Sequence, residues 1–147
     1  MLIGQYVSKL TDKDRIAVPA KFRQELGENL IVAKWYENCL VLVSKESWEK
    51  LLKRLVGISE IVVSPVRDVD RFILGSAFEV SLDKQGRFVL PDVLQSFANI
   101  KEEVVFVGLS DRVEIWAGKK WLELEETAED KASRAIEKVA LGQKPSQ

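Results

Sequence analysis

The chain has 147 residues with 22 basic and 23 acidic side chains, so its formal net charge of −1 gives no overall reason to expect a nucleic-acid partner. Its composition, 46% hydrophobic and 31% charged, is ordinary for a folded protein. Histidine is absent and Cys39 is the single cysteine, which argues against acid–base catalysis, a multi-thiolate metal site and an intrachain disulfide.

The N-terminus lacks the basic start and long apolar core of a signal peptide. No run of about 18 apolar residues occurs anywhere in the chain. Together with the unpaired cysteine, these features predict a cytoplasmic protein with no membrane segment.

One pattern of elements occurs twice at a spacing of about 72 residues. Residues 10–19, Leu-Thr-Asp-Lys-Asp-Arg-Ile-Ala-Val-Pro, reappear at 82–91 as Leu-Asp-Lys-Gln-Gly-Arg-Phe-Val-Leu-Pro. Trp48 and Trp121 align at one residue more. The chain therefore contains two copies of one unit.

The first copy opens with an alternating stretch, Tyr6 to Leu10, followed by a charged loop and the apolar run 16–18. This pattern predicts strand, turn and strand, with Asp14 as a residue that tolerates the left-handed region in the turn. Pro19 suits the first turn of a short helix that runs to about Gly27.

A strand pair is predicted next, at 30–33 and 40–43, around a turn at Asn38. Ser44 then caps a helix with an apolar face. That face consists of Trp48, Leu51, Leu52 and Leu55. Ser64 and Pro65 start a further helix between the copies, and its apolar residues are Val66, Val69 and Ile73.

The second copy follows the same order. Strands are predicted at Phe78 to Leu82 and at 88–90, around a turn in which Gly86 adopts positive φ cheaply. Pro91 then starts a short helix that ends near Asn99. The later elements are a strand pair at 104–107 and 113–116 with a turn at 110–112, a helix that opens near Gly118, and the end of a long helix from about Ala128 to Leu141.

Charge is unevenly distributed between the copies. Residues 1–26 hold five basic and three acidic side chains, a net charge of +2, whereas residues 76–117 hold four basic and seven acidic side chains, a net charge of −3. Residues 27–75 and 118–147 are each neutral. The basic surplus therefore surrounds the first loop.

Two interpretations of the loop charges stay open at this point. Arg15 and Arg87 recur just after the turn in each copy, and a loop-borne arginine suits a phosphate group or the O6/N7 edge of guanine. A cluster of exposed charges is also common on a solvated protein surface. An ion pair between Asp83 and Arg87 would brace the turn, and one arginine can serve both purposes.

The pattern Leu-Asp-x-x-Gly-Arg-x-x-x-Pro at 82–91 and its duplicate at 10–19 resemble the MraZ family. The start at Ile3 to Tyr6 and the stretch Pro19 to Arg23 also fit that family, and the resemblance covers about residues 1–141. It implies an α+β fold in which two AbrB/MraZ-type swapped-hairpin half-barrels pair into one β-barrel-like unit with flanking short helices. The implied domains are a first repeat at 1–56, a linker with a helix at 57–75, a second repeat with a C-terminal helix at 76–141 and a frayed tail at 142–147.

The resemblance also implies a function. MraZ proteins are bacterial transcription regulators that form ring-shaped homo-oligomers. They bind promoter direct repeats upstream of the division and cell-wall gene cluster, usually as repressors, so the implied location is the cytoplasmic nucleoid. The DNA-binding residues that the resemblance implies are the loop arginines Arg15, the more important of the two, and its counterpart Arg87. From the chemistry of the residues we expect Arg15 to read guanine and the flanking cations to bind DNA as well, with phosphate contacts from Lys9, Lys13, Lys21 and Arg23 and a further candidate at Lys84.

The charge distribution predicts different roles for the two loop arginines, with Arg15 in contact with DNA and Arg87 chiefly holding the fold or the ring. The chain departs from the family pattern at Thr11, where the family has Asp, and at Asp14, where it has glycine. Either the first loop is less fixed, or Asp12 substitutes for the missing acid.

Two other classes of protein are considered. An enzyme is disfavoured, because the chain offers no histidine and no nucleophile motif, and we expect no cofactor, metal or small-molecule substrate. The remaining candidates are predicted to be structural: a half-buried thiol at Cys39, and surface ion pairs among Arg67, Asp68, Asp70 and Arg71. The alternative function is an oligomeric module of the AbrB/antitoxin type whose main partner is another protein. Trp35, Tyr36 and Trp121 could serve such an interface, whereas Trp48 and Trp116 are expected in the core.

Overall fold

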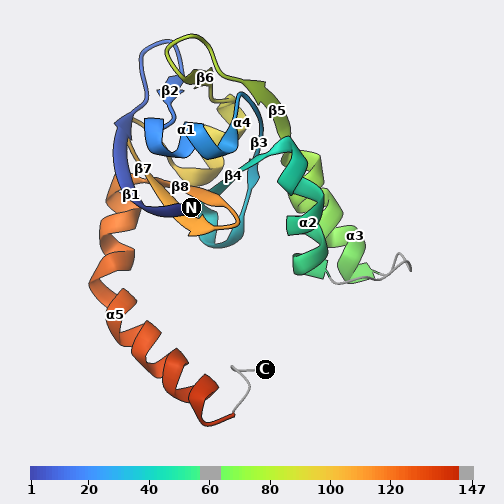
Figure 1. The fold of residues 1–147 in the computed structure, drawn as a ribbon, viewed down its shortest axis with the longest axis vertical. Coiled ribbons are helices and arrows are strands. Elements are labelled where there is room, and N and C mark those ends of the chain that lie inside the picture. Colours follow the sequence, from blue (N-terminus) through green and yellow to red (C-terminus); the bar gives the residue numbers. More distant parts are fainter. Residues whose placement is uncertain (57–63, 143–147) are drawn as a thin grey trace.

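The structure, a computed structural model, describes residues 1–56 and 64–142 (Figure 1). The start of the expected linker, 57–63, and the expected tail beyond residue 142 lie outside the described residues. The strands are β1 (Leu2–Lys9), β2 (Arg15–Ala17), β3 (Asn29–Lys34), β4 (Leu40–Ser44), β5 (Phe78–Ser81), β6 (Arg87–Val89), β7 (Glu103–Ser110) and β8 (Val113–Ala117). The helices are α1 (Ala20–Leu26), α2 (Lys45–Val56), α3 (Ser64–Ile73), α4 (Asp92–Ala98) and α5 (Gly118–Ala140), with 3₁₀ turns at Tyr36–Asn38 and Leu74–Ser76.

Strands of the two copies interleave in one antiparallel sheet. The order of the six strands is β1-β7-β8-β4-β3-β5, and β2 and β6 form a separate two-stranded ribbon. β1 of the first copy pairs with β7 of the second over its whole length, and β5 of the second pairs with β3 of the first. The fold is therefore α+β, as expected, and neither copy completes its sheet without the other.

The expected strand, turn and strand units are present, but the two strands of each unit are not partners. Two backbone hydrogen bonds close each turn. In the first, Thr11 N donates to Arg15 O at 2.9 Å and Asp14 N to Thr11 O at 3.0 Å; in the second, Asp83 N donates to Arg87 O at 2.9 Å and Gly86 N to Asp83 O at 3.0 Å. Beyond these bonds β2 pairs with β6 of the other copy. Alternation along one strand predicts which side chains share a face, but it does not identify the neighbouring strand.

The short helices α1 and α4 begin and end as their sequences direct. Pro19 and Pro91 stand at the N-cap positions, one residue before the predicted first turn, where an extended ψ precedes the helix. Gly27 and Asn99 end the helices with φ of 78° and 55°, as predicted for C-cap residues. The turn at Asn38 is also confirmed: Glu37 and Asn38 both have positive φ, as a two-residue type I′ turn requires.

Both faces of the sheet are covered, which explains its nearly continuous apolar strands. Along β3, Leu30 and Val32 face one core, while Ile31 and Ala33 face the other. The first core lies beneath α1, α4 and the β2–β6 ribbon. These elements contribute Phe22, Leu26, Leu94, Ala98, Ile16 and Phe88.

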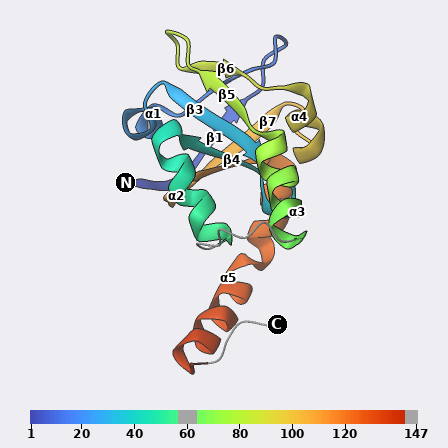
Figure 2. The same cartoon turned by 90° about the vertical axis from the view of Figure 1, so that its right-hand side faces the viewer.

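The second core lies between the sheet and α2, α3 and the first turns of α5 (Figure 2). Ser44 caps α2 as predicted, because its Oγ accepts a hydrogen bond from Ser47 N at 3.2 Å. The predicted apolar faces of α2 and α3 are confirmed by the buried residues Trp48, Leu51 and Ile73. From Glu125 onward α5 is exposed and projects from the domain (Figure 1). Among the described residues, no helix is both long and apolar enough to span a membrane.

Burial decides the roles of the cysteine and the tryptophans. Cys39 is fully buried rather than half-buried, and burial, reinforced by Glu114 and Glu37, raises the pKa of its thiol far above the ordinary value. The thiol is therefore a packing group. Trp48 and Trp116 are core residues, as expected, but Trp35 is buried as well. Of the three suggested interface aromatics, Tyr36 is 45% exposed and Trp121, partly buried, donates a hydrogen bond to Gln5 Oε1 at 2.9 Å.

Candidate nucleic-acid interface

The two repeated loops lie at the same end of the molecule. The first joins β1 to β2 and the second joins β5 to β6, and both rise from the ribbon at the end opposite the free end of α5 (Figures 1 and 2). Beside the β2–β6 ladder, one backbone hydrogen bond ties each loop to the other copy: Leu90 N donates to Asp14 O of the first loop at 2.7 Å, and Val18 N donates to Gly86 O of the second at 2.9 Å. The loops are therefore fixed relative to each other.

The register of the ribbon places both loop arginines on its outer face. Arg15 lies opposite Val89, and Arg87 lies opposite Ala17. The intervening pair, Ile16 and Phe88, is buried at 0% and 2% exposure. Because side chains alternate along a strand, burying this pair turns Arg15 and Arg87 together toward solvent.

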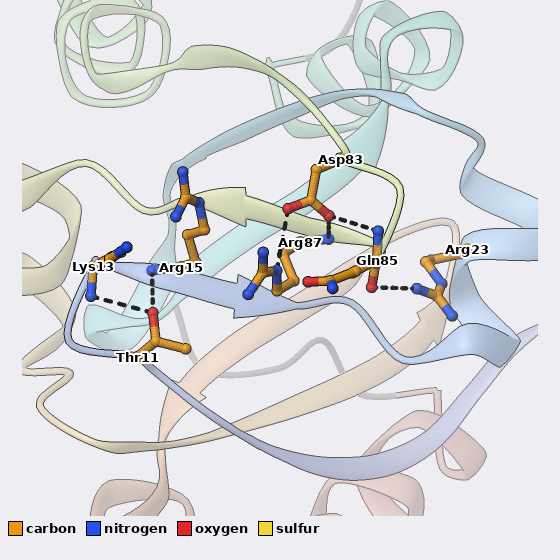
Figure 3. Close-up of polar contacts among 7 residues, drawn as sticks. All are labelled: Thr11, Lys13, Arg15, Arg23, Asp83, Gln85 and Arg87. Atoms are coloured by element: carbon orange, nitrogen blue, oxygen red, sulfur yellow. Dashed lines mark hydrogen bonds and ion pairs between the residues drawn. The ribbon is translucent and has the colours of Figure 1, made fainter.

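Asp83 organises the second loop. Its Oδ1 accepts hydrogen bonds from Gln85 N at 2.8 Å and from Arg87 N at 2.9 Å, and its Oδ2 accepts one from Arg87 Nε at 3.1 Å (Figure 3). The bond from the Arg87 backbone N–H is the main reason that the pKa of Asp83 is lowered, and the Gln85 N–H and the Arg87 guanidinium add to it. The expected ion pair between Asp83 and Arg87 is thus confirmed.

Thr11 stabilises the turn of the first loop but does not hold the side chain of its arginine. Its Oγ1 accepts hydrogen bonds from Lys13 N at 3.3 Å and from Arg15 N at 3.1 Å, so the turn is kept (Figure 3). The hydroxyl offers no second oxygen to the side chain of Arg15. Within the described part of the chain, the Arg15 guanidinium has no hydrogen bond or ion pair, and Asp12 does not take the role suggested for it.

The positions at the tip of each turn are equivalent in backbone but not in side chain. Asp14 and Gly86 have φ of 60° and 76°, as predicted for both. At Gly86 a Cβ atom would overlap the guanidinium of Arg23, so glycine makes room for that side chain. At Asp14 the loop carries an additional acid beside Arg15.

Arg23 belongs to α1 of the first copy but contacts the second loop. Its Nη1 donates to Gln85 O at 3.0 Å (Figure 3). The helix next to the second loop therefore supplies Arg23, and Lys21 is exposed on the same helix. Sequence reasoning grouped Arg23 with the first loop and did not identify Gln85, because no local signal marks a carbonyl that a distant helix approaches.

The helix beside the first loop is α4, which follows β6, and its exposed side chains differ from those of α1. Leu90 bonds to Asp14 and leads directly into α4. At the positions that match Lys21 and Arg23 in the repeat, α4 has Val93 and Gln95, and Gln95 Nε2 donates to Leu90 O at 2.8 Å. The exchange of partners between copies therefore brings Arg23 of the first copy to the second loop.

The remaining predicted site residues lie around this end without joining one cluster. Lys13 and Lys84 are exposed within the first and second loops, respectively. Lys9 ends β1 opposite Glu103 in the ladder, which places an acid across from it. The loops therefore offer cations at several separate points, an arrangement suited to an extended polyanion.

Other chemistry has little support among the described residues. They contain no group of three His, Cys, Asp or Glu residues that could hold a metal ion. The suggested surface ion pairs are represented by Arg71 and Asp68, whose Nη1 and Oδ1 atoms are 3.7 Å apart on exposed side chains.

These features define a two-repeat α+β protein whose interleaved copies present paired arginine loops on one surface. Comparison with known families places it further: the model described as "MraZ protein, putative antitoxin-like" matches residues 1–63 and 73–143, and the chain belongs to the MraZ family. The resemblance stated from the sequence is thereby confirmed.

Relatives cover most of the chain. It is 39% identical over 142 residues to a protein of Clostridium acetobutylicum, covering 97% of this chain and 99% of the relative. It is 40% identical over 123 residues to one of Caldanaerobacter subterraneus subsp. tengcongensis, covering 84% of this chain and 85% of the relative. Both relatives are named "Transcriptional regulator MraZ", a name that denotes a regulator rather than an enzyme.

Proposed function

We propose that this protein is a sequence-specific, double-stranded-DNA-binding transcriptional regulator. The observation that carries the proposal is the ribbon register that turns Arg15 and Arg87 outward together at the loop-bearing end. The major groove of B-DNA is about 12 Å wide and admits a two-stranded β-ribbon, and arginine is the commonest reader of guanine there. The names of the relatives support the same function.

In this proposal the two arginine loops approach the major groove, where an arginine reads a base edge, while exposed lysines of the same end contact phosphates and fix the register on DNA. The proposed phosphate contacts are Lys9, Lys13, Lys21 and Lys84. Arg23 has a second task, because its bond to Gln85 O supports the loop from which Arg87 projects.

The finer architecture of the family is proposed for this chain as well. Pairing of β1 with β7, of β5 with β3 and of β2 with β6 supports two swapped-hairpin half-barrels that complete one another. The assembly proposed is a ring-shaped homo-oligomer.

Two unlike apolar edges support such an assembly. The edge strand β1 exposes Ile3 and Val7, at 48% and 65%, whereas the edge strand β5 exposes Phe78, at 38%. Contact between two different surfaces of one chain is heterologous, and heterologous contacts generate rings when the rotation closes. Successive copies on successive promoter direct repeats would gain avidity of about 10²–10⁴. The proposed setting is repression of the division and cell-wall gene cluster at the cytoplasmic nucleoid.

Salt dependence and a double variant test the function. The protein first enriches DNA duplexes from a library that is randomised at its centre. Gel shifts then use probes that carry one or several copies of the enriched site. We expect steep loss of affinity with salt, tighter binding to several copies, and loss of sequence preference in Arg15→Ala/Arg87→Ala. Arg71→Ala, which breaks an exposed pair with Asp68, is the matched control.

Binding by the double variant equal to that of the wild type would contradict the proposal. A flat response to salt together with tight binding of a protein partner would instead favour the antitoxin-type alternative, which the names of the relatives do not favour.

A further inference from the structure

We infer that the second loop supplies the base-reading arginine of this chain, Arg87, and that Arg15 serves chiefly as a phosphate contact. The inference rests on the proposed DNA-binding function. It reverses the roles that the charge distribution of the sequence predicts for the two arginines. The chemical partner of Arg87 is the O6/N7 edge of a guanine in the major groove.

The side chain of Arg87 is held in place before DNA binds. Asp83 holds Arg87 through Nε, at 3.1 Å, and holds its backbone N–H as well. Bidentate recognition of guanine uses two parallel N–H groups of the guanidinium fork, and the Nε contact leaves the Nη groups for that purpose. A side chain that is already held loses less rotamer freedom on binding, so more of its contact energy appears as discrimination.

The first loop lacks this support. Thr11 keeps the turn, but its single oxygen is occupied by the backbone N–H groups of Lys13 and Arg15. The Arg15 guanidinium is unheld among the described residues, and Asp12 and Asp14 lie beside it in the chain. A mobile cation adapts readily to a phosphate, whose oxygens accept hydrogen bonds from many directions, but discriminates bases less well.

The fold also gathers different charge around each loop. The helix beside the second loop brings Arg23 onto Gln85 O and carries exposed Lys21, and the loop itself has Lys84. The matching positions beside the first loop are Val93 and Gln95. The second loop therefore has the stronger local attraction for the phosphates that flank a base contact.

A single base-reading loop makes the DNA site of each chain directional. Two loops that read DNA equally would be related by the approximate two-fold relation of the copies and would favour a symmetric site. One dominant loop instead gives each chain a directional site, with its guanine preference at one end.

Selection from the randomised duplex library, done in parallel on the wild type and single variants, tests this. Wild type is expected to enrich a directional motif containing guanine. Arg87→Ala should lose discrimination at that guanine by about 5- to 150-fold, the loss of one bidentate contact. Arg15→Ala should keep the motif, bind more weakly to all sequences and lower the salt slope by about one.

Asp83 is the positioning residue, and its variant must separate positioning from folding. Asp83→Thr copies the first loop, so the turn should be retained while the guanine preference falls at an unchanged salt slope. The double variant Thr11→Asp/Asp83→Thr should recover a motif through the first loop. A residue needed only for folding would lose specific and non-specific binding together, and Thr11→Asp would not restore either.

The results separate this inference from the function on which it rests. A motif that Arg15→Ala abolishes and Arg87→Ala preserves overturns the inference but leaves the DNA-binding function intact. Equal loss in both variants also overturns it. If the wild type enriches no motif at all, the proposed function fails and this inference fails with it.

Discussion

The two loops share a backbone but differ in how they hold their arginines. In both, the residue four positions before the arginine, Thr11 in the first loop and Asp83 in the second, accepts two of the turn's backbone N–H groups on one side-chain oxygen. Only the carboxylate has a second oxygen, which binds the Arg87 side chain. The comparison shows that conserving a turn and positioning its functional group are separate tasks that one substitution can uncouple.

The loops also differ in their neighbours, for a reason that lies outside both of them. Each loop is bonded to the copy that does not contain it, so the basic helix α1 supports the second loop. A charge surplus counted along the first copy is thereby shared with the second.

Removing a buried side chain from the inner face of the β2–β6 ribbon should displace both loops and so abolish the difference between them. Phe88 is 2% exposed in the first core, and Phe88→Ala is expected to lower the free energy of unfolding by about 3–5 kcal/mol. Urea denaturation measures this. Val89→Ala, on the 52% exposed neighbour, should change stability by no more than about 0.5 kcal/mol. Equal effects of the two variants would mean that the ribbon is not anchored by its inner face.

Substitution at Gly86 should affect the second loop in two ways. Its φ of 76° costs an L-residue roughly 1–2 kcal/mol, and the new Cβ would displace the Arg23 guanidinium from Gln85 O. Gly27→Ala is the matched control, because Gly27 has φ of 78° and nothing within 4 Å of a Cβ.

Both glycine variants should lose stability in urea denaturation, whereas only Gly86→Ala should weaken DNA binding in gel shifts. Identical DNA binding by the two variants would show that the position of Arg23 is irrelevant to the second loop.

Supplying the missing acid should make the first loop resemble the second. Thr11→Asp is expected to hold the Arg15 guanidinium, so its Nε–H should exchange slowly with water and become visible by NMR, as that of Arg87 should be in the wild type. Thr11→Ser keeps the hydroxyl and should leave Arg15 unchanged. A signal of Arg15 Nε–H already as protected as that of Arg87 in the wild type would remove the distinction between the loops.

The smallest predicted effect is the change in the stability of the protein at acid pH. Because the pKa of Asp83 is lowered in the folded state, its contribution to stability is present above its ordinary value of 3.8 and is lost as pH falls through the lower folded value. The stability difference between wild type and Asp83→Asn should therefore be constant from neutral pH to about pH 5 and shrink only in stronger acid. A difference that disappears between pH 7 and pH 5 would contradict this, and urea denaturation across that range measures it.

Much of the local structure was accessible from the sequence. The repeat, the strands, the turn residues Asp14 and Gly86, the helix ends at Gly27 and Asn99 and the cap at Ser44 follow from short-range rules, and the structure has them where predicted, within a few residues. Pairing was not accessible, because alternation describes one strand and says nothing of which strand adjoins it. The burial of Trp35 and Cys39 likewise depends on helices that cover the sheet from elsewhere in the chain.

For the candidate site, the sequence by itself determined which residues recur: the two loop arginines, the acid kept as Asp83 and replaced by Thr11, and the prolines that start the following helices. It also determined the class of protein, because two tandem copies of one pattern are specific to the family. Only the tertiary structure decided that the arginines share an outer face and that Arg23 serves the loop of the other copy. The physical reason is that backbone pairing joins segments about 72 residues apart, so the charge that a loop experiences is set by its neighbours in space and not by its neighbours in the chain.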